Sequence, residues 1–96
     1  MKRGDLVRVA FPGDDGKPRP ALVIQSDVYK DMESVTVLPI TSDLRDAFHF
    51  RVTLEPDLTN KLRVRSQVMV DKAGTLPRAK VGAAFGHLAE HDLSAV

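Results

Sequence analysis

One arginine and two hydroxyl residues occupy positions from which they can bind a phosphate group together. Arg19 lies between a charged, Gly/Pro-rich segment and an apolar stretch, and Pro20 favours an extended backbone that aims the Arg19 side chain. Thr41 and Ser42 directly follow another apolar stretch, 37–40. A guanidinium with two hydroxyl groups suits a tetrahedral phosphate, so we expect a phosphate site if the two stretches are neighbouring strands. The alternative is an ordinary loop cation, because Arg-Pro and Thr-Ser are common dipeptides.

Histidines offer two other kinds of chemistry. His87 and His91, in the sequence HLAEH, have the spacing that lets two imidazoles on one helix face bind one zinc ion. We favour a solvated helix start and predict no metal site, because the third ligand has to come from elsewhere. His49 lies on the polar face of a predicted strand, two residues from Arg51. There it is either a proton donor or acceptor for catalysis, or a plain surface residue.

Three further arginines are expected on the outward faces of two strands that can be neighbours: Arg51, Arg63 and Arg65. Such a basic sheet surface suits a phosphate backbone. The alternative, which the sequence leaves open, is a charged face balanced by nearby Asp and Glu residues. The formal net charge of the whole chain is only +1, so these cations indicate nucleic-acid binding only if the fold gathers them on one face.

The elements that position these residues follow mainly a period of two, which predicts strands. The predicted strands are 5–11, 21–25, 34–41, 48–54 and 62–71, and the predicted helix is 87–96. Segments 26–34 and 75–82 are expected to connect strands without being strands themselves, and each has room for one turn of helix. Short strands joined by turns in a chain of this length favour a mainly β fold with short helices, in which a small twisted sheet closes toward a barrel.

Side-chain patterns make the strand predictions specific. The run 21–25 is almost continuously apolar, as expected of a strand buried on both faces. Pro39 removes a backbone donor, so it is expected at a sheet edge, a bulge or a strand end. Alternation within 48–54 and 62–71 predicts which side chains point to the core. Phe50, Val64 and Val70 are expected to face inward and Gln67 outward.

Composition restricts the class of protein. A chain of 96 residues with 43% hydrophobic and 28% charged residues predicts one folded domain over residues 1–96. It has no cysteine, which excludes disulfides and thiolate metal sites and favours a reducing compartment. The sequence contains neither a signal-peptide pattern nor an apolar run of the roughly 20 residues that span a membrane. We therefore expect a cytoplasmic protein.

Four segments in order carry a family resemblance: KRGDLVRVAF, GKPRPALVIQSDVY, VTVLPITSD and RSQVMVDKAGTLPRAKVGAAFGHL. Together they cover nearly the whole chain, and it resembles the MazF/PemK/Kid family of bacterial toxins. The resemblance implies an SH3-like, CcdB-like barrel with appended helices, usually a homodimer. It also implies a metal-independent endoribonuclease that needs no cofactor and cuts single-stranded RNA such as mRNA, and a MazE-like antitoxin that blocks the RNA groove.

The same resemblance assigns roles to residues of this chain. The family's arginine before proline falls on Arg19, its strand-end threonine and serine on Thr41 and Ser42, and an aspartate used as a base on Asp71. The expected catalytic residues are thus Arg19, Thr41 and Asp71, with RNA contacts from Lys17, Ser42, His49, Arg51 and Arg65. His49 is the reserve for the base, and which group is the acid stays open.

Two rival functions use the same fold. One is a gyrase poison like CcdB, which engages its target through a tryptophan-containing terminal helix. This chain has no tryptophan and ends in DLSAV, which counts against that function. The other rival is an SH3-like binding module without chemistry. An RNA digestion separates all three hypotheses.

Overall fold

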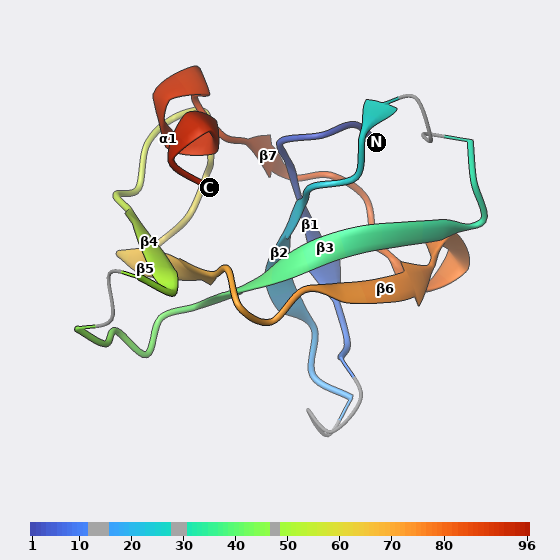
Figure 1. Ribbon diagram of the computed structural model, residues 1–96, viewed down its shortest axis with the longest axis horizontal. Coiled ribbons are helices and arrows are strands. Elements are labelled where there is room, and N and C mark those ends of the chain that lie inside the picture. The colour runs from blue at the N-terminus through green and yellow to red at the C-terminus, as the bar shows by residue number, and fades with distance from the viewer. Residues whose placement is uncertain (12–15, 28–30, 47–48) are drawn as a thin grey trace.

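The computed structural model describes residues 1–11, 16–27, 31–46 and 49–96 (Figure 1). Most of its regular secondary structure is β-strand. The described strands are β1 (Asp5–Val9), β2 (Arg19–Val23), β3 (Ser34–Thr41), β4 (Arg51–Leu54), β5 (Ser66–Met69), β6 (Gly74–Pro77) and β7 (Gly86–His87). A 3-10 helix, η2 (Arg78–Lys80), follows β6, and a short helix, α1 (Glu90–Ala95), ends the chain. The prediction of a mainly β fold with short helices is confirmed.

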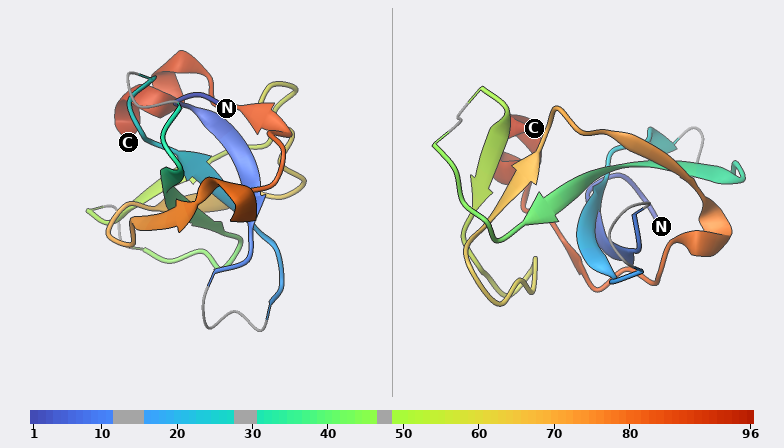
Figure 2. Two further views of the ribbon diagram at one scale, coloured as in Figure 1. Left: turned by 90° about the vertical axis from the view of Figure 1, so that its right-hand side faces the viewer. Right: turned by 90° about the horizontal axis from the view of Figure 1, so that it is seen from below.

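The long strand β3 organises the sheet. The strand order is β4-β5-β3-β2-β1-β7, and β6 also pairs with β3, so one edge of β3 contacts first β6 and then β5. Figure 2 shows β4 and β5 to one side of the molecule and β1, β2 and β6 to the other, with β3 running through both parts. The residue after η2, Val81, bridges to Val9 of β1. The path from β1 through β2, β3 and β6 therefore returns to β1, and the sheet curves toward a barrel as expected.

Pro39 lies inside this central strand, so the prediction of an edge, bulge or strand end was wrong. Ile24 N donates to Thr36 O, so the backbone groups of the even-numbered residues of β3 point toward β2. The backbone groups of the odd-numbered residues, Pro39 among them, point toward the opposite edge of β3. On that edge β6 pairs with 34–37 and β5 with 40–41. Pro39 falls in the gap between them, where no ladder bond needs its missing N–H.

The core has two parts, one on each face of the strands β1 to β3. Leu6, Leu22 and Leu38 belong to one apolar cluster, and Val7, Ala21 and Val37 to the other. These strands alternate between the two clusters, which is the period of two seen in the sequence. Ala21, Leu22 and Val23 are all at most 3% exposed, so the prediction that this strand is buried on both faces is confirmed.

Two predicted strands are shorter than the pattern suggested. Within 48–54 only Arg51–Leu54 form β4, and within 62–71 only Ser66–Met69 form β5. Phe50 and Val64 are each 55% exposed and Val70 is 37% exposed, so the expectation that they face the core was wrong. The parts of the predictions that fall on 12–15, 28–30 and 47–48 lie outside the described residues.

Gln67 is 7% exposed, although alternation placed it on the outward face. The loop after β3 covers it: the Gln67 side chain accepts from Arg45 N (2.9 Å) and donates to Arg45 O (3.0 Å). The predicted alternation was correct about the direction of the side chain and wrong about solvent. Such a loop is not visible in a local pattern, because it packs on β5 from 22 residues away.

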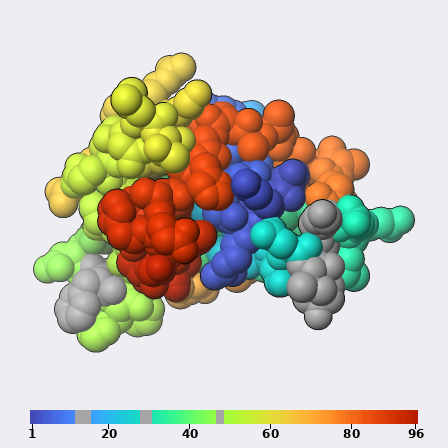
Figure 3. Space-filling model, turned by 90° about the horizontal axis from the view of Figure 1, so that it is seen from above, coloured from blue at the N-terminus to red at the C-terminus, as the bar shows by residue number. Residues whose placement is uncertain are grey.

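The C-terminal segment begins as a strand and ends as a helix. The predicted helix 87–96 is correct only from Glu90 onward, because Gly86–His87 pair with β1 and Leu88 N donates to Gly4 O (2.9 Å). Leu93 and Val96 pack against the first core cluster. Seen from above, α1 (red) lies between the segment after β4 (yellow) and the N-terminal residues (blue) (Figure 3). Among the described residues, no helix has the length and apolar character to cross a membrane.

Candidate functional site

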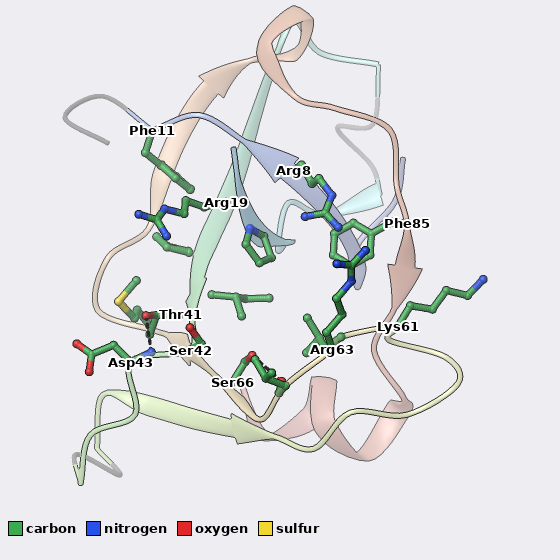
Figure 4. A pocket seen from close by; sticks show the side chains of 16 residues that line it. Arg8, Phe11, Arg19, Thr41, Ser42, Asp43, Lys61, Arg63, Ser66 and Phe85 are labelled. Atoms are coloured by element: carbon green, nitrogen blue, oxygen red, sulfur yellow. Dashed lines mark hydrogen bonds between the residues drawn. The ribbon is translucent and has the colours of Figure 1, made fainter. Parts of the chain in front are cut away.

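A groove of about 670 Å³ opens where β1, β2, β3 and the loop before β5 meet (Figure 4). Phe11, Arg19, Thr41 and Asp43 lie on one side, and Arg8, Lys61, Arg63 and Phe85 lie on the other. Ser42 and Ser66 lie between the two sides. The volume falls within the range of about 300–1,000 Å³ that is typical of ligand sites. The remaining lining residues are Pro20, Pro39, Ile40, Leu62, Val64 and Met69.

Sheet register brings Arg19 and Thr41 together. β2 and β3 are antiparallel neighbours, with Ala21 opposite Pro39. Continued by two residues, this register sets Arg19, the first residue of β2, opposite Thr41, the last residue of β3. Both residues, and Ser42 after them, line the groove. The expectation from sequence that these ends are close therefore agrees with the geometry, while the catalytic roles stay predictions.

Thr41 is oriented by the turn that follows it. Its hydroxyl oxygen accepts a hydrogen bond from Asp43 N at 3.0 Å. A hydroxyl that accepts in this way still has its own hydrogen to donate. The Thr41 hydroxyl can thus donate to a phosphate oxygen in the groove without breaking the turn.

The turn itself is tied to the sheet by Arg51. One Arg51 nitrogen, Nη1, donates to Asp43 O (2.7 Å) and to Gln67 Oε1 (3.1 Å). Arg51 is absent from the groove lining, so its hydrogen bonds support the loop that carries Ser42 and Asp43. The predicted RNA contact at Arg51 is therefore not one that the groove provides.

Four cations and one carboxylate line the groove among the described residues: Arg8, Arg19, Lys61 and Arg63 against Asp43. The Asp43 carboxylate contacts the Arg45 guanidinium at 3.2 Å on the exposed surface. The groove is therefore basic although the chain as a whole is nearly neutral. Such a concentration of positive charge suits an anionic backbone.

Several residues predicted to act at the site lie outside the groove lining. Asp71 follows β5 in the turn that leads to β6, with its carboxylate 3.8 Å from Lys72 Nζ. Lys17 is exposed, and His49 stacks edge-on against Phe50. Arg65 pairs with Glu55 at 2.6 Å, with both side chains more than half exposed. The groove lining includes none of these residues.

Of the two alternatives that the sequence left open for Arg51, Arg63 and Arg65, the shared basic sheet face is absent from the structure. Arg63 and Arg65 precede β5 and are not on a strand, so they share no sheet face with Arg51 of β4. Arg63 points into the groove, whereas Arg65 pairs with a surface carboxylate. Residues two apart share a face only on a strand. Arg63 and Arg65 lie in a loop, so their side chains can point in different directions.

The HLAEH pattern does not bring its histidines to one metal. His87 is on β7 and its Nδ1 lies 2.9 Å from Asp5 Oδ1, while His91 is on α1 and contacts Asp92 at 3.4 Å. The shared helix face on which the zinc alternative depended is absent. In the part of the chain that the structure describes, no group of three or more His, Cys, Asp or Glu residues is placed to hold a metal ion.

Sequence reasoning missed the second side of the groove. The sequence patterns assigned no function to Arg8 or to Phe85. They meet because β7 pairs with β1, which joins positions near the two ends of the chain. The Arg8 guanidinium lies over the Phe85 ring, 4.6 Å from its centroid. A period-two pattern does not show such a pair, because it carries no information on strand pairing.

Comparisons with known proteins agree with this geometry. The family model described as "PemK-like, MazF-like toxin of type II toxin-antitoxin system" matches residues 2–96. The chain is 42% identical over 94 residues to the "Probable endoribonuclease MazF" of Mycolicibacterium smegmatis. This alignment covers 97% of the chain and 86% of that protein.

Solved structures of toxins with this fold also align over most of the chain. The Mycobacterium tuberculosis toxin MazF-mt6 superposes with a TM-score of 0.81 at 26% identity, covering 95% of this chain and 86% of that one. The Deinococcus radiodurans MazE–MazF structure, Form-II, gives 0.76 at 26% identity, covering 99% and 86%. The resemblance that the sequence motifs indicated is confirmed.

Proposed function

Because the chain belongs to the family of PemK-like, MazF-like toxins of type II toxin–antitoxin systems, we propose that it is an endoribonuclease that cuts single-stranded RNA at short sequences. The observation that carries this proposal is the meeting of Arg19, Thr41 and Ser42 in one basic groove. A phosphodiester held there faces a guanidinium and two hydroxyl groups. These groups can bind the phosphoryl oxygens of RNA, and the RNA itself supplies the nucleophile, its 2′-hydroxyl.

The reaction that fits these groups is attack by the RNA's own 2′-hydroxyl on the adjacent phosphorus. The new bond joins the 2′-oxygen to phosphorus, and the bond from phosphorus to the 5′-oxygen breaks. A base takes the proton from the 2′-hydroxyl, and the leaving 5′-oxygen takes up a proton. The products are a 2′,3′-cyclic phosphate and a 5′-hydroxyl. No cofactor is needed, because substrate and side chains supply the nucleophile and the proton transfers.

Arg19 stabilises the charge that builds on the phosphoryl oxygens in this mechanism. The planar fork of a guanidinium matches two oxygens at once, so charge stabilisation suits this side chain better than proton donation. Thr41 donates its hydroxyl hydrogen to the same phosphate, and Ser42 adjoins it. Preorganised donors of this kind contribute about 3–4 kcal/mol each to transition-state stabilisation.

Two carboxylates compete for the role of base. Asp71 has the position that the family resemblance assigns to it, and a change in the turn before β6 is required to bring it into the groove. Asp43 already lines the groove next to Thr41. A general base has to reach the proton that it removes. We favour Asp43 because it lines the groove, although its carboxylate has to turn from Arg45, which it contacts on the exposed surface.

The partners follow from the same family. We propose a homodimer in the cytoplasm, a single toxin domain over residues 1–96, and a MazE-like antitoxin that covers the groove. The support for the antitoxin is the likeness to toxins solved together with MazE in Deinococcus radiodurans. A basic groove that binds RNA is blocked most directly by a segment that occupies it.

The experiment that tests the function is digestion of a panel of single-stranded RNAs in EDTA. The expected products carry a 2′,3′-cyclic phosphate and a 5′-hydroxyl, detected by mass spectrometry. Arg19→Ala is expected to abolish cleavage with an unchanged circular dichroism spectrum. Gyrase-dependent DNA breaks without RNA products would instead indicate a gyrase poison, and neither activity would leave a binding module.

A further inference from the structure

The side of the groove that faces Arg19 carries a stacked pair with no role in the chemistry described above. The Arg8 guanidinium lies over the Phe85 ring at 4.6 Å from its centroid, and both residues line the groove (Figure 4). Arg8 comes from the middle of β1 and is exposed. Phe85 directly precedes β7, and Phe85 N donates to Leu6 O at 2.8 Å. The pairing of β1 with β7 therefore sets the ring beneath the guanidinium.

A rigid loop completes this side of the groove. The buried Asn60 side chain, 0% exposed, accepts from Asp57 N (3.1 Å) and Leu62 N (2.9 Å) and donates to Glu55 O (2.9 Å). The next residue, Lys61, has a φ of 56°, a conformation that a non-glycine residue rarely adopts. These bonds hold the strained backbone in place. Arg63 points into the groove toward the Arg8–Phe85 pair, whereas the Lys61 side chain extends away from it (Figure 4).

The same loop is attached to the strand that carries Phe85. His87 N donates to Thr59 O at 3.0 Å. Gly86 packs so closely on Asn60 that a Cβ there would clash with the Asn60 carbonyl oxygen. The loop and β7 therefore form one unit, which fixes the backbone that carries Arg63 relative to the Arg8–Phe85 stack. A preorganised site of this kind loses little conformational entropy when it binds a ligand.

We propose that the Arg8–Phe85 stack is a base-binding subsite that holds a nucleotide next to the cleaved phosphodiester, with Arg63 on its phosphate. The inference rests on the proposed function. Both groups line the groove, and unpaired RNA bases stack on arginine planes and aromatic rings. Stacking tolerates any base, so this subsite contributes affinity and register.

The test uses RNA oligonucleotides that carry a single abasic nucleotide, moved one position at a time around the cleavage site. For the unmodified protein, cleavage is expected to fall by about tenfold at one flanking position, where the stacked base is lost. Phe85→Leu removes the ring, and Arg8→Lys keeps the charge but removes the plane. In both variants the abasic penalty at that position is expected to shrink to less than twofold, because the contact is already gone.

The matched control is Arg78→Lys, the same exchange at an arginine of η2 that is absent from the groove lining. It is expected to keep the full abasic penalty. If Phe85→Leu does not fold, as judged by its melting curve, Arg8→Lys decides alone. Cleavage by the unmodified protein with no position-specific penalty, or a penalty that both variants retain, would overturn the subsite. A protein that cuts none of the RNAs would overturn the proposed function and this inference together.

Discussion

At the scale of single residues, the groove depends on the geometry of its side chains more than on their charge. Arg19 is aimed by the extended backbone before Pro20 and lies across from Thr41 by sheet register. Thr41 in turn is oriented by its hydrogen bond from Asp43 N. A flexible cation at the same place attracts RNA equally well but does not present two parallel donors to one phosphate.

Arg19→Lys is therefore expected to reduce kcat by about 100-fold, which is the cost of removing one preorganised donor to a developing oxyanion. The charge is kept, so KM is expected to change by less than about threefold. Single-turnover cleavage of one RNA by both proteins measures the difference. A lysine variant with undiminished kcat would remove the argument for a two-pronged contact.

The two candidate bases are separated by matched substitutions. Asp43→Asn is expected to lower kcat by about 100-fold or more, as is typical for loss of a general base. Asp71→Asn, at a carboxylate outside the groove lining, is expected to stay within about threefold. Cleavage rates of both variants between pH 5 and pH 9 provide the comparison. The reverse order of effects would assign the base to Asp71.

At the scale of elements, the fold keeps two segments in unusual positions so that the groove can form. β3 changes its neighbour from β6 to β5 at Pro39, and the part of β3 from Pro39 to Thr41 lines the groove. The loop before β5 carries the strained Lys61 and is held by the buried Asn60 side chain. In β3 the missing N–H of Pro39 falls where no ladder bond is needed. In the loop, backbone N–H groups are bound by the Asn60 side chain.

Asn60→Ala is expected to destabilise the protein by about 3 kcal/mol, because three hydrogen bonds of the buried Asn60 side chain are lost. Urea denaturation followed by circular dichroism gives the free energy of unfolding. The control in the same loop is Leu58→Ala, at a side chain that is 95% exposed, with an expected change below about 0.5 kcal/mol. Equal effects of the two substitutions would mean that the Asn60 hydrogen bonds do not hold the loop.

At the scale of the whole molecule, the arrangement of charge matters more than its sum. The formal net charge is +1, yet four cations from three parts of the chain meet in one groove. These parts are β1, the start of β2 and the loop before β5. Electrostatic attraction of RNA to this groove is consequently local and sensitive to salt.

Affinity for a 2′-O-methyl RNA, which lacks the nucleophile, is expected to fall with salt by a log–log slope of about −0.7 for each phosphate contacted. With two or three contacts the slope lies between about −1.4 and −2.1. Fluorescence anisotropy at a series of salt concentrations gives this slope. Arg63→Gln is expected to reduce it by about 0.7, and Lys80→Gln, outside the groove, to leave it unchanged. A slope near zero for the unmodified protein would contradict an electrostatic groove.

Local sequence was sufficient for much of the fold. The period of two predicted β1, β2, β3 and parts of β4 and β5, because alternating side chains on a pleated strand are a property of neighbouring residues. The Arg19–Thr41 meeting was also within reach, since adjacent antiparallel strands set their opposite ends side by side. The motifs and their order were sufficient for the family resemblance, because they do not depend on strand pairing.

Other features were decided only when distant segments packed. Gln67 is buried because a loop 22 residues away covers it, and His87 is on a strand because β1 offers it a partner. The Arg8–Phe85 stack exists because β7 returns to β1 from the far end of the chain. The physical reason is common to all three: backbone preference acts over a few residues, whereas burial and ladder pairing depend on which segments meet in space.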